Sequence, residues 1–159
     1  MTSKKVTRVA VAVLLAACSP AARDAPVSSA SDGLAGEVGA VIDRYVSAAS
    51  AGDSMAIRDI LVADDRFAWI EDGDLRYRSA DEVLDGLRGF PADTQIETTL
   101  SDLTVVPLGE SGAYAWSPFT TTVGQGTGGF SFGGLLSFVL ERRDGAWRIV
   151  GGHTSSPRG

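Results

Sequence analysis

Two hydrophobic periodicities divide the chain, and their order restricts the folds that it can adopt. Between Leu34 and about Ala51, apolar residues recur at helical spacing, which is typical of an amphipathic helix with one buried stripe. The residues of this stripe are Val38, Val41, Ile42, Tyr45, Val46 and Ala49. From Thr94 onward, segments rich in β-branched and aromatic residues alternate with turn residues, which is typical of strands. This order predicts an α+β domain with helices packed on one side of an antiparallel sheet.

Capping and turn signals place shorter elements between these two regions. Asp53 can cap a short second helix, and Ser79 with Glu82 forms a capping box that opens a third. Between those two helices, Asp72-Gly73 predicts a hairpin turn that joins two short strands. Three helices are therefore expected on the N-terminal side of the main sheet.

Four strands are expected after the third helix. They are predicted at 94–106, with an irregularity near Asp102, and at 113–123, 130–141 and 146–154. Long strands that contain glycines and bulges favour a strongly curved sheet. Such a sheet can close around a pocket.

The N-terminus carries the features of a signal peptide. Lys4, Lys5 and Arg8 precede the apolar stretch 9–17, which is too short to span a bilayer as a helix. The next residue is Cys18, and Leu15-Ala16-Ala17-Cys18 resembles the bacterial lipobox. This resemblance implies cleavage before Cys18 and acylation of that residue, including a palmitate-type chain. An ordinary secretory signal and a cytosolic chain with an apolar start are the alternatives.

We therefore expect three segments. Residues 1–17 form a lipoprotein signal peptide, residues 18–33 a lipidated flexible tether of small and polar residues, and residues 34–159 the folded domain. Acyl chains on Cys18 would hold the domain to a lipid bilayer. The expected location is the cell envelope outside the cytoplasm, on the periplasmic face of the outer membrane if the cell is Gram-negative.

Composition excludes several function classes. The net charge of -6 argues against nucleic acid as a partner. The single cysteine excludes an internal disulfide, and with the single histidine it argues against a metal site. The glycine-rich stretch 124–134 lacks the lysine of a phosphate-binding loop. No cofactor is expected.

The order of elements from Leu34 to the end resembles the nuclear transport factor 2-like superfamily, specifically its SnoaL-like, ketosteroid-isomerase-related branch. The segments that carry the resemblance are Ile42–Val46, Ala51–Asp53, Ala63–Phe67, Ser79–Val83 and Asp144–Val150, the last leading to His153–Ser155. The resemblance implies a cone-shaped fold whose curved sheet and helices enclose a mainly apolar cavity.

In the steroid isomerases of this branch, a carboxylate moves a proton while a tyrosine and a protonated aspartic acid stabilise an enolate oxygen. Tyr45 stands at the match to the tyrosine. The aspartic-acid position falls near Ser137 or Phe138, where no carboxyl group exists. The base position falls near Trp69 or Ile70, and Glu71 and Asp72 follow closely. Faithful steroid-isomerase chemistry is therefore not expected.

Two sets of candidate site residues follow. The catalytic candidates are Tyr45, His153 and Glu71. The candidates for ligand binding are Tyr45, Trp69, Tyr77, Trp116 and His153. The alternative is that the aromatic residues only fill the core, that Glu71 belongs to a solvated turn, and that His153 makes a structural hydrogen bond.

Two classes of function remain open at this point. The favoured one is a membrane-anchored lipoprotein whose cavity binds a small apolar ligand or whose sheet forms a homodimer. The alternative is an enzyme that performs proton transfer, cyclisation or hydration in the cavity. Binding is favoured because one of the isomerase groups is missing. A carboxylate that points into the cavity near Tyr45 and His153 would favour the enzyme.

Overall fold

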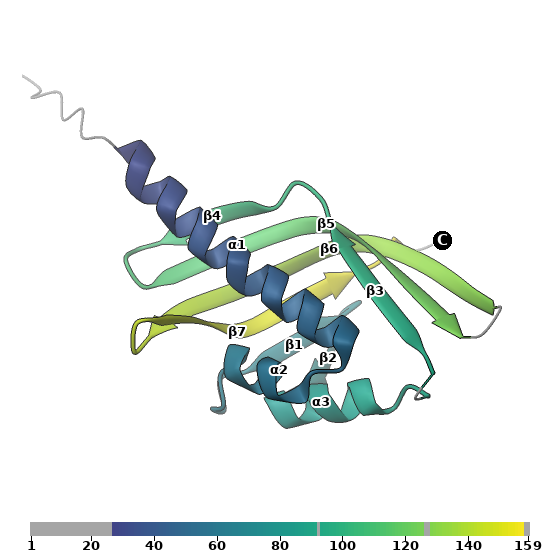
Figure 1. The fold of residues 1–159 in the computed structure, drawn as a ribbon. Coiled ribbons are helices and arrows are strands. Elements are labelled where there is room, and N and C mark those ends of the chain that lie inside the picture. The colour runs from purple at the N-terminus through teal and green to yellow at the C-terminus, as the bar shows by residue number, and fades with distance from the viewer. Residues whose placement is uncertain (1–26, 92, 126–127, 158–159) are drawn as a thin grey trace, which may run out of the picture.

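Helices dominate the first part of the described chain and strands the second, as predicted (Figure 1). The computed structural model describes residues 27–91, 93–125 and 128–157. The helices are α1 (Val27–Ala51), α2 (Ser54–Ile60) and α3 (Ala80–Arg88). The strands are β1 (Ala68–Glu71), β2 (Asp74–Tyr77), β3 (Gln95–Leu100), β4 (Thr104–Leu108), β5 (Gly112–Gln125), β6 (Gly128–Arg143) and β7 (Ala146–Ser155).

The strands form one sheet in the order β2-β1-β7-β6-β5-β3, and β4 also pairs with β5. All pairs are antiparallel except β1 with β7. The single strand predicted over 94–106 is wrong, because the chain breaks at Asp102, whose φ is +56°. Its two halves pair with opposite ends of β5, and the buried Ser117 hydroxyl bonds to both backbone groups of Ser101 at the break.

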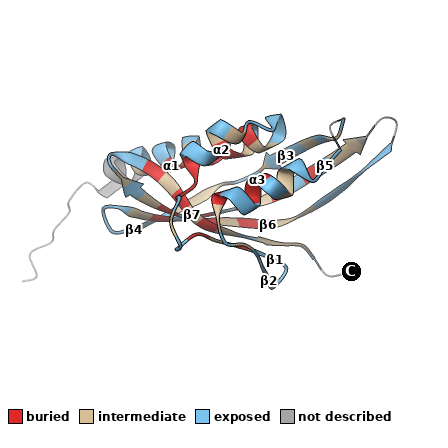
Figure 2. Ribbon diagram, turned by 90° about the horizontal axis from the view of Figure 1, so that it is seen from below, coloured by how far each residue is buried: buried red, intermediate tan, exposed pale blue. Residues whose placement is uncertain are grey.

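Helix α1 crosses the concave face of the sheet, and the core lies between them (Figures 1 and 2). Val38, Ile42 and Tyr45 are buried on its sheet-facing stripe, as the periodicity predicts. The caps are also confirmed: Asp53 accepts hydrogen bonds from two backbone N–H groups of α2, and Ser79 caps α3.

Helix α1 begins earlier than predicted. It starts at Val27 instead of Leu34, so residues 27–33 belong to a helix and not to an extended tether. Alanine and serine are tolerated in helices, and no proline follows Pro26 until Pro91. This first part of α1 projects beyond the sheet in Figure 1.

None of the helices in the described residues is long and apolar enough to cross a membrane. The predicted signal peptide of residues 1–17 and residues 18–26, which include Cys18, lie outside the described residues.

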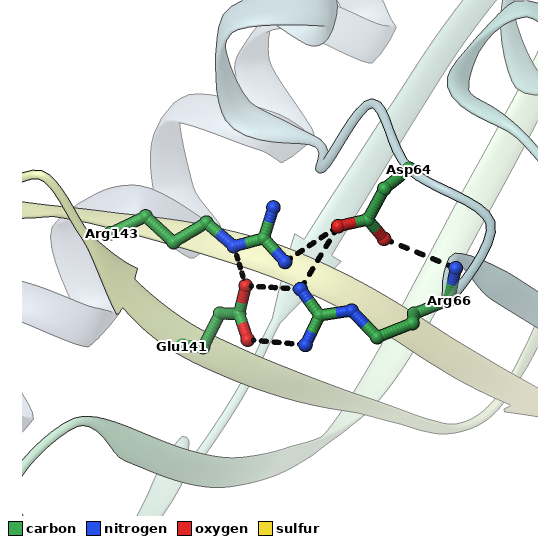
Figure 3. A network of polar contacts seen from close by, with 4 residues as sticks. All are labelled: Asp64, Arg66, Glu141 and Arg143. Carbon is green, nitrogen blue, oxygen red and sulfur yellow. Dashed lines mark hydrogen bonds and ion pairs between the residues drawn. The ribbon is translucent and has the colours of Figure 1, made fainter.

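Four charged side chains join the loop before β1 to the end of β6 (Figure 3). The Arg66 guanidinium donates to both carboxylate oxygens of Glu141, at 3.0 and 3.1 Å, and to Asp64 at 2.9 Å. Arg143 contacts the same two carboxylates, with its Nη2 at 2.6 Å from Asp64. Each charge thus has two opposite partners, an arrangement that is stronger than an isolated surface pair. The network fixes the chain that leads into β1 and its site residues.

Candidate functional site

A cavity of about 490 Å³ opens between the helices and the concave face of the sheet, and we call it the main cavity. Helices α1 and α3 contribute one wall, and strands β3, β5 and β6 contribute another. The ends of β1, β2 and β7 close one side. The volume suits a small organic molecule.

Three aromatic rings pack together at the main cavity, and two of them, Tyr45 and Trp69, line it. The Tyr45 and Trp69 ring centroids are 5.7 Å apart, and the Phe138 ring stands edge-on to both at about 6 Å. Gly152 lies beside Trp69 on the neighbouring strand, where an added Cβ would lie 2.5 Å from the indole ring. Glycine at this position is therefore what allows the indole to lie flat against β7.

Tyr77 forms the side wall next to these rings. It pairs with Trp69 across β1 and β2 and faces α3. Its hydroxyl fills the space over Gly86, where any side chain would collide with it. The Arg76 guanidinium lies over the Tyr77 ring, 5.5 Å from the centroid.

Glu71 and Arg76 supply opposite charges at the same side of the main cavity. The Arg76 Nε lies 3.6 Å from Glu71 Oε2, and the two side chains are 60% and 41% exposed. Burial raises the pKa of the Glu71 carboxyl above its ordinary value, Arg76 opposes this shift, and Asp72 adds to it. Glu71 is thus a carboxylate that holds a proton more readily than a solvated one.

Tyr45 presents a hydroxyl group without a protein partner. The residue is 8% exposed, and within the described residues no side chain or backbone group bonds to its hydroxyl. Every fully buried side-chain polar atom of the described residues has a hydrogen-bond partner. The Tyr45 hydroxyl has none, so it is not fully buried and opens to the main cavity that Tyr45 lines. Burial, Tyr77 and Glu71 raise the Tyr45 pKa. The hydroxyl therefore stays neutral and can donate to or accept from a ligand.

The structure brings four of the sequence-predicted residues together and separates two. Tyr45, Trp69, Tyr77 and Glu71 all line the main cavity. Trp116 and His153 lie on the opposite, outer face of the sheet, where Trp116 is 37% exposed. The proposed group of Tyr45, His153 and Glu71 does not form.

A bulge explains where His153 lies. Simple alternation from the buried Trp147 and Ile149 would turn His153 inward. Val139 pairs with Gly151 and Leu140 with Ile149, so Val150 is an extra residue on β7. One added residue exchanges the two faces, and Thr154 faces the main cavity in place of His153.

Trp116 faces outward for a different reason. Its neighbours Ala115 and Ser117 are fully buried on the inner face. Ala115 lies opposite the buried Phe138, and the Ser117 hydroxyl bonds to the backbone of Ser101, so both positions belong to the inner face. The tryptophan therefore occupies the outer face.

Several residues that line the main cavity were not predicted from the sequence. The mouth carries Phe119, Phe130 and Phe132, whose rings contact one another with centroids about 6 Å apart. Phe130 and Phe132 fall within the strand predicted at 130–141, and their Phe-Ser-Phe alternation places both rings on one face, but they were not among the candidate site residues. Thr98 and Thr121 also line the cavity and share a hydrogen bond of 2.8 Å.

The outer face of the sheet is rich in exposed apolar side chains. Trp116 and Tyr114 lie at its centre, and Val139 pairs with Tyr114 on β6. The exposed apolar residues of this face are Ile70, Leu75, Val106, Leu108, Tyr114, Trp116, Leu135 and Val139.

In the described ranges, no group of three His, Cys, Asp or Glu side chains could hold a metal ion.

The raised pKa of Glu71 leads to a stability prediction. Below the ordinary glutamate value of 4.5, Glu71 is protonated in both folded and unfolded states. As the pH rises through its folded pKa, the contribution of Glu71 to folding stability falls. Glu71→Gln, which is neutral at every pH, should therefore be slightly more stable than the parent at neutral pH, an advantage that disappears below pH 4.5.

Urea denaturation at both pH values measures this difference. Glu97→Gln, which removes an exposed carboxylate from the outer face of β3, is the control and should show no comparable change. A Glu71→Gln protein that is less stable than the parent at neutral pH would contradict the assigned environment.

Comparisons with known proteins agree with this architecture. The model of the SnoaL-like domain family matches residues 38–159. A nuclear transport factor 2-like superfamily protein from Salmonella enterica serovar Typhimurium has a TM-score of 0.71 at 17% identity, covering 81% of this chain and 94% of the other. Rv3472 from Mycobacterium tuberculosis, a protein of unknown function, has a TM-score of 0.71 at 18% identity, covering 85% and 78%. An NTF2-like protein from Novosphingobium aromaticivorans has a TM-score of 0.66 at 19% identity, covering 78% and 82%.

No match was found among curated protein sequences. The structural neighbours share the fold at low identity, and the family model covers most of the chain. The chain therefore belongs to the SnoaL-like domain family.

Proposed function

We propose that this domain binds a small, mainly apolar organic molecule in the main cavity. The observation that carries this proposal is the unpartnered hydroxyl of the buried Tyr45 at the end of an aromatic cavity. A hydroxyl that opens to the cavity without a protein partner can donate to or accept from a bound ligand. The surrounding rings would bury the apolar body of the ligand.

The composition of the wall supports a compact, ring-sized ligand. Leu136 and Phe119 contribute apolar surface to the main cavity, and Phe132 packs against Phe119. Polar groups gather at the side of Glu71, and a hydroxyl pair lies on β3 and β5. Such a wall orients a molecule that is apolar in the middle and polar at its ends.

A pair of variants tests this binding site. Val123 lies on the inner face of β5 and lines the main cavity, whereas Thr122 points to the outer face. Val123→Trp should fill the cavity and weaken binding of naphthylmethanol at least about tenfold, while Thr122→Trp should leave it unchanged. Isothermal titration calorimetry gives both affinities. Equal losses in the two variants, or no binding to the parent by this probe or any co-purified molecule, would contradict the proposal.

A second candidate is acid–base catalysis in the same cavity. Glu71 holds a proton more readily than an ordinary glutamate, and the Tyr45 hydroxyl faces the same space. A carboxyl group of this kind suits proton transfer beside a carbonyl, with the tyrosine donating to the oxygen. The position of the isomerase aspartic acid is still without a carboxyl group, which is why binding is preferred. Turnover of a cyclic ketone that Glu71→Gln abolishes without loss of binding would decide for catalysis.

We also propose that the mature protein is a lipoprotein anchored outside the cytoplasm through Cys18. The support is the sequence Leu15-Ala16-Ala17-Cys18 after a basic and apolar start. In cells fed labelled palmitate, the parent should incorporate label and partition into membranes, and Cys18→Ala should do neither. Ser19→Ala is the control and should behave as the parent does. Labelling that survives Cys18→Ala would contradict the anchor.

The outer face of the sheet supports a homodimer. Exposed apolar residues on adjacent strands of this kind are common at interfaces between subunits. Trp116→Glu should shift the mass measured by sedimentation equilibrium from dimer to monomer, whereas Glu97→Gln on the neighbouring edge strand should not. A parent that sediments as a monomer at high concentration would contradict the dimer.

A further inference from the structure

We propose that the ligand of the main cavity is an organic cation, namely a protonated amine attached to an aromatic or alicyclic body. This inference rests on the proposed binding function and specifies the chemical class of its ligand. The ammonium group would lie between the Glu71 carboxylate and the Tyr45 hydroxyl, and the body would lie against Phe119 and Leu136.

The balance of charge in the cavity favours a cation over an anion. Glu71 and Asp72 line it with two carboxylates, and Arg76 is its one cationic side chain in the part of the chain that the structure describes. Asp74, the first residue of β2, is a further exposed carboxylate close to these two in the chain. An anionic ligand would be repelled by this excess of carboxylates, whereas a cation would be attracted.

The protein already places a cation at this position. The Arg76 guanidinium meets both the Glu71 carboxylate, at 3.6 Å, and the face of the Tyr77 ring, at 5.5 Å from its centroid. A carboxylate next to an aromatic face is the environment that binds organic cations. Because the Arg76 side chain is 60% exposed, its withdrawal into solvent would cost little and would vacate that position for a ligand.

The Tyr45 hydroxyl supplies an independent observation. It is buried, it opens to the main cavity, and no described group bonds to it. An ammonium group has three N–H donors, so one can bond to Glu71 and a second to the tyrosine oxygen. A ligand carbonyl would also satisfy the tyrosine, but its oxygen would face the Glu71 carboxylate, another acceptor.

Three probes of one shape test this inference. Naphthylmethylamine is a cation at neutral pH, naphthylmethanol is neutral and naphthoate is an anion. The full-length protein in detergent should bind the amine about tenfold or more tightly than the alcohol, and the acid more weakly than either, since a hydrogen bond to a charged group is strong. Isothermal titration calorimetry at neutral pH measures all three.

Variants then assign the preference to named groups. Glu71→Gln should remove the preference for the amine while the alcohol still binds, and Arg76→Gln should strengthen amine binding. Tyr45→Phe should weaken it, and Glu97→Gln, on the outer face, should change nothing.

Each result is decisive. If the alcohol binds as tightly as the amine, or the acid binds best, the cation assignment is wrong although the binding function stands. If Glu97→Gln lowers amine affinity as much as Glu71→Gln does, the preference comes from the overall negative charge and the assignment is again wrong. If none of the probes binds, the cation assignment is wrong, and if no molecule co-purifies with the parent either, the proposed function fails with it.

Discussion

The strict alternation of side chains along the β5–β6 ladder is the constraint on which the rest of the structure depends. The two strands pair from Gly112 and Glu141 to Gln125 and Gly128, and each paired position presents both side chains to the same face. On the inner face, Ala113 and Ala115 of β5 pair with the buried Leu140 and Phe138 of β6, and all four belong to the hydrophobic core. Farther along the ladder, Phe119 and Phe132 line the main cavity. The same alternation sends Tyr114 and Trp116 to the outer face, so one ladder builds both the candidate ligand site and the candidate subunit interface.

The polar part of the cavity depends on how β1 and β2 are held against β7. Parallel pairing places Trp69 beside Gly152 and Glu71 beside Thr154, which turns both side chains into the cavity. Arg66, just before β1, is fixed by Asp64 and Glu141, so the entry to this strand is tied to the far end of β6 (Figure 3). Glu71, a partly buried carboxylate with a raised pKa, lines the same cavity as the Tyr45 hydroxyl, and carboxylates with perturbed pKa values cluster at functional sites. Cavity shape and electrostatics thus point to the same position.

Local signals in the sequence predicted much of the fold. The stripe through Tyr45 and the caps at Asp53 and Ser79 each depend on residues close in the chain, and each is present in the structure. The return bond of the capping box differs from the prediction, because the Glu82 carboxylate accepts from the backbone N–H of Arg78. The Asp72-Gly73 turn is also present, with φ of +50° and +100°. The structure differs from expectation where distant contacts decide. The break at Asp102 separates two strands because β5 offers each half a different partner, and no local pattern encodes that choice.

The candidate site was predictable to a similar extent. Tyr45, Trp69, Tyr77 and Glu71 follow from the family resemblance and from the Asp72-Gly73 hairpin, and they meet in one cavity. His153 was misplaced because the bulge at Val150 exchanges the faces of β7, and a bulge is visible only in the pairing with β6.

The central claim is that ligands bind in the main cavity, on the inner face of the sheet. Methyl-resolved NMR with naphthylmethanol tests this claim most directly. The account predicts shifts at Val123, Leu136 and Leu87, which line the cavity, and none at Leu135 and Val139 on the outer face. Shifts confined to Leu135 and Val139 would contradict it.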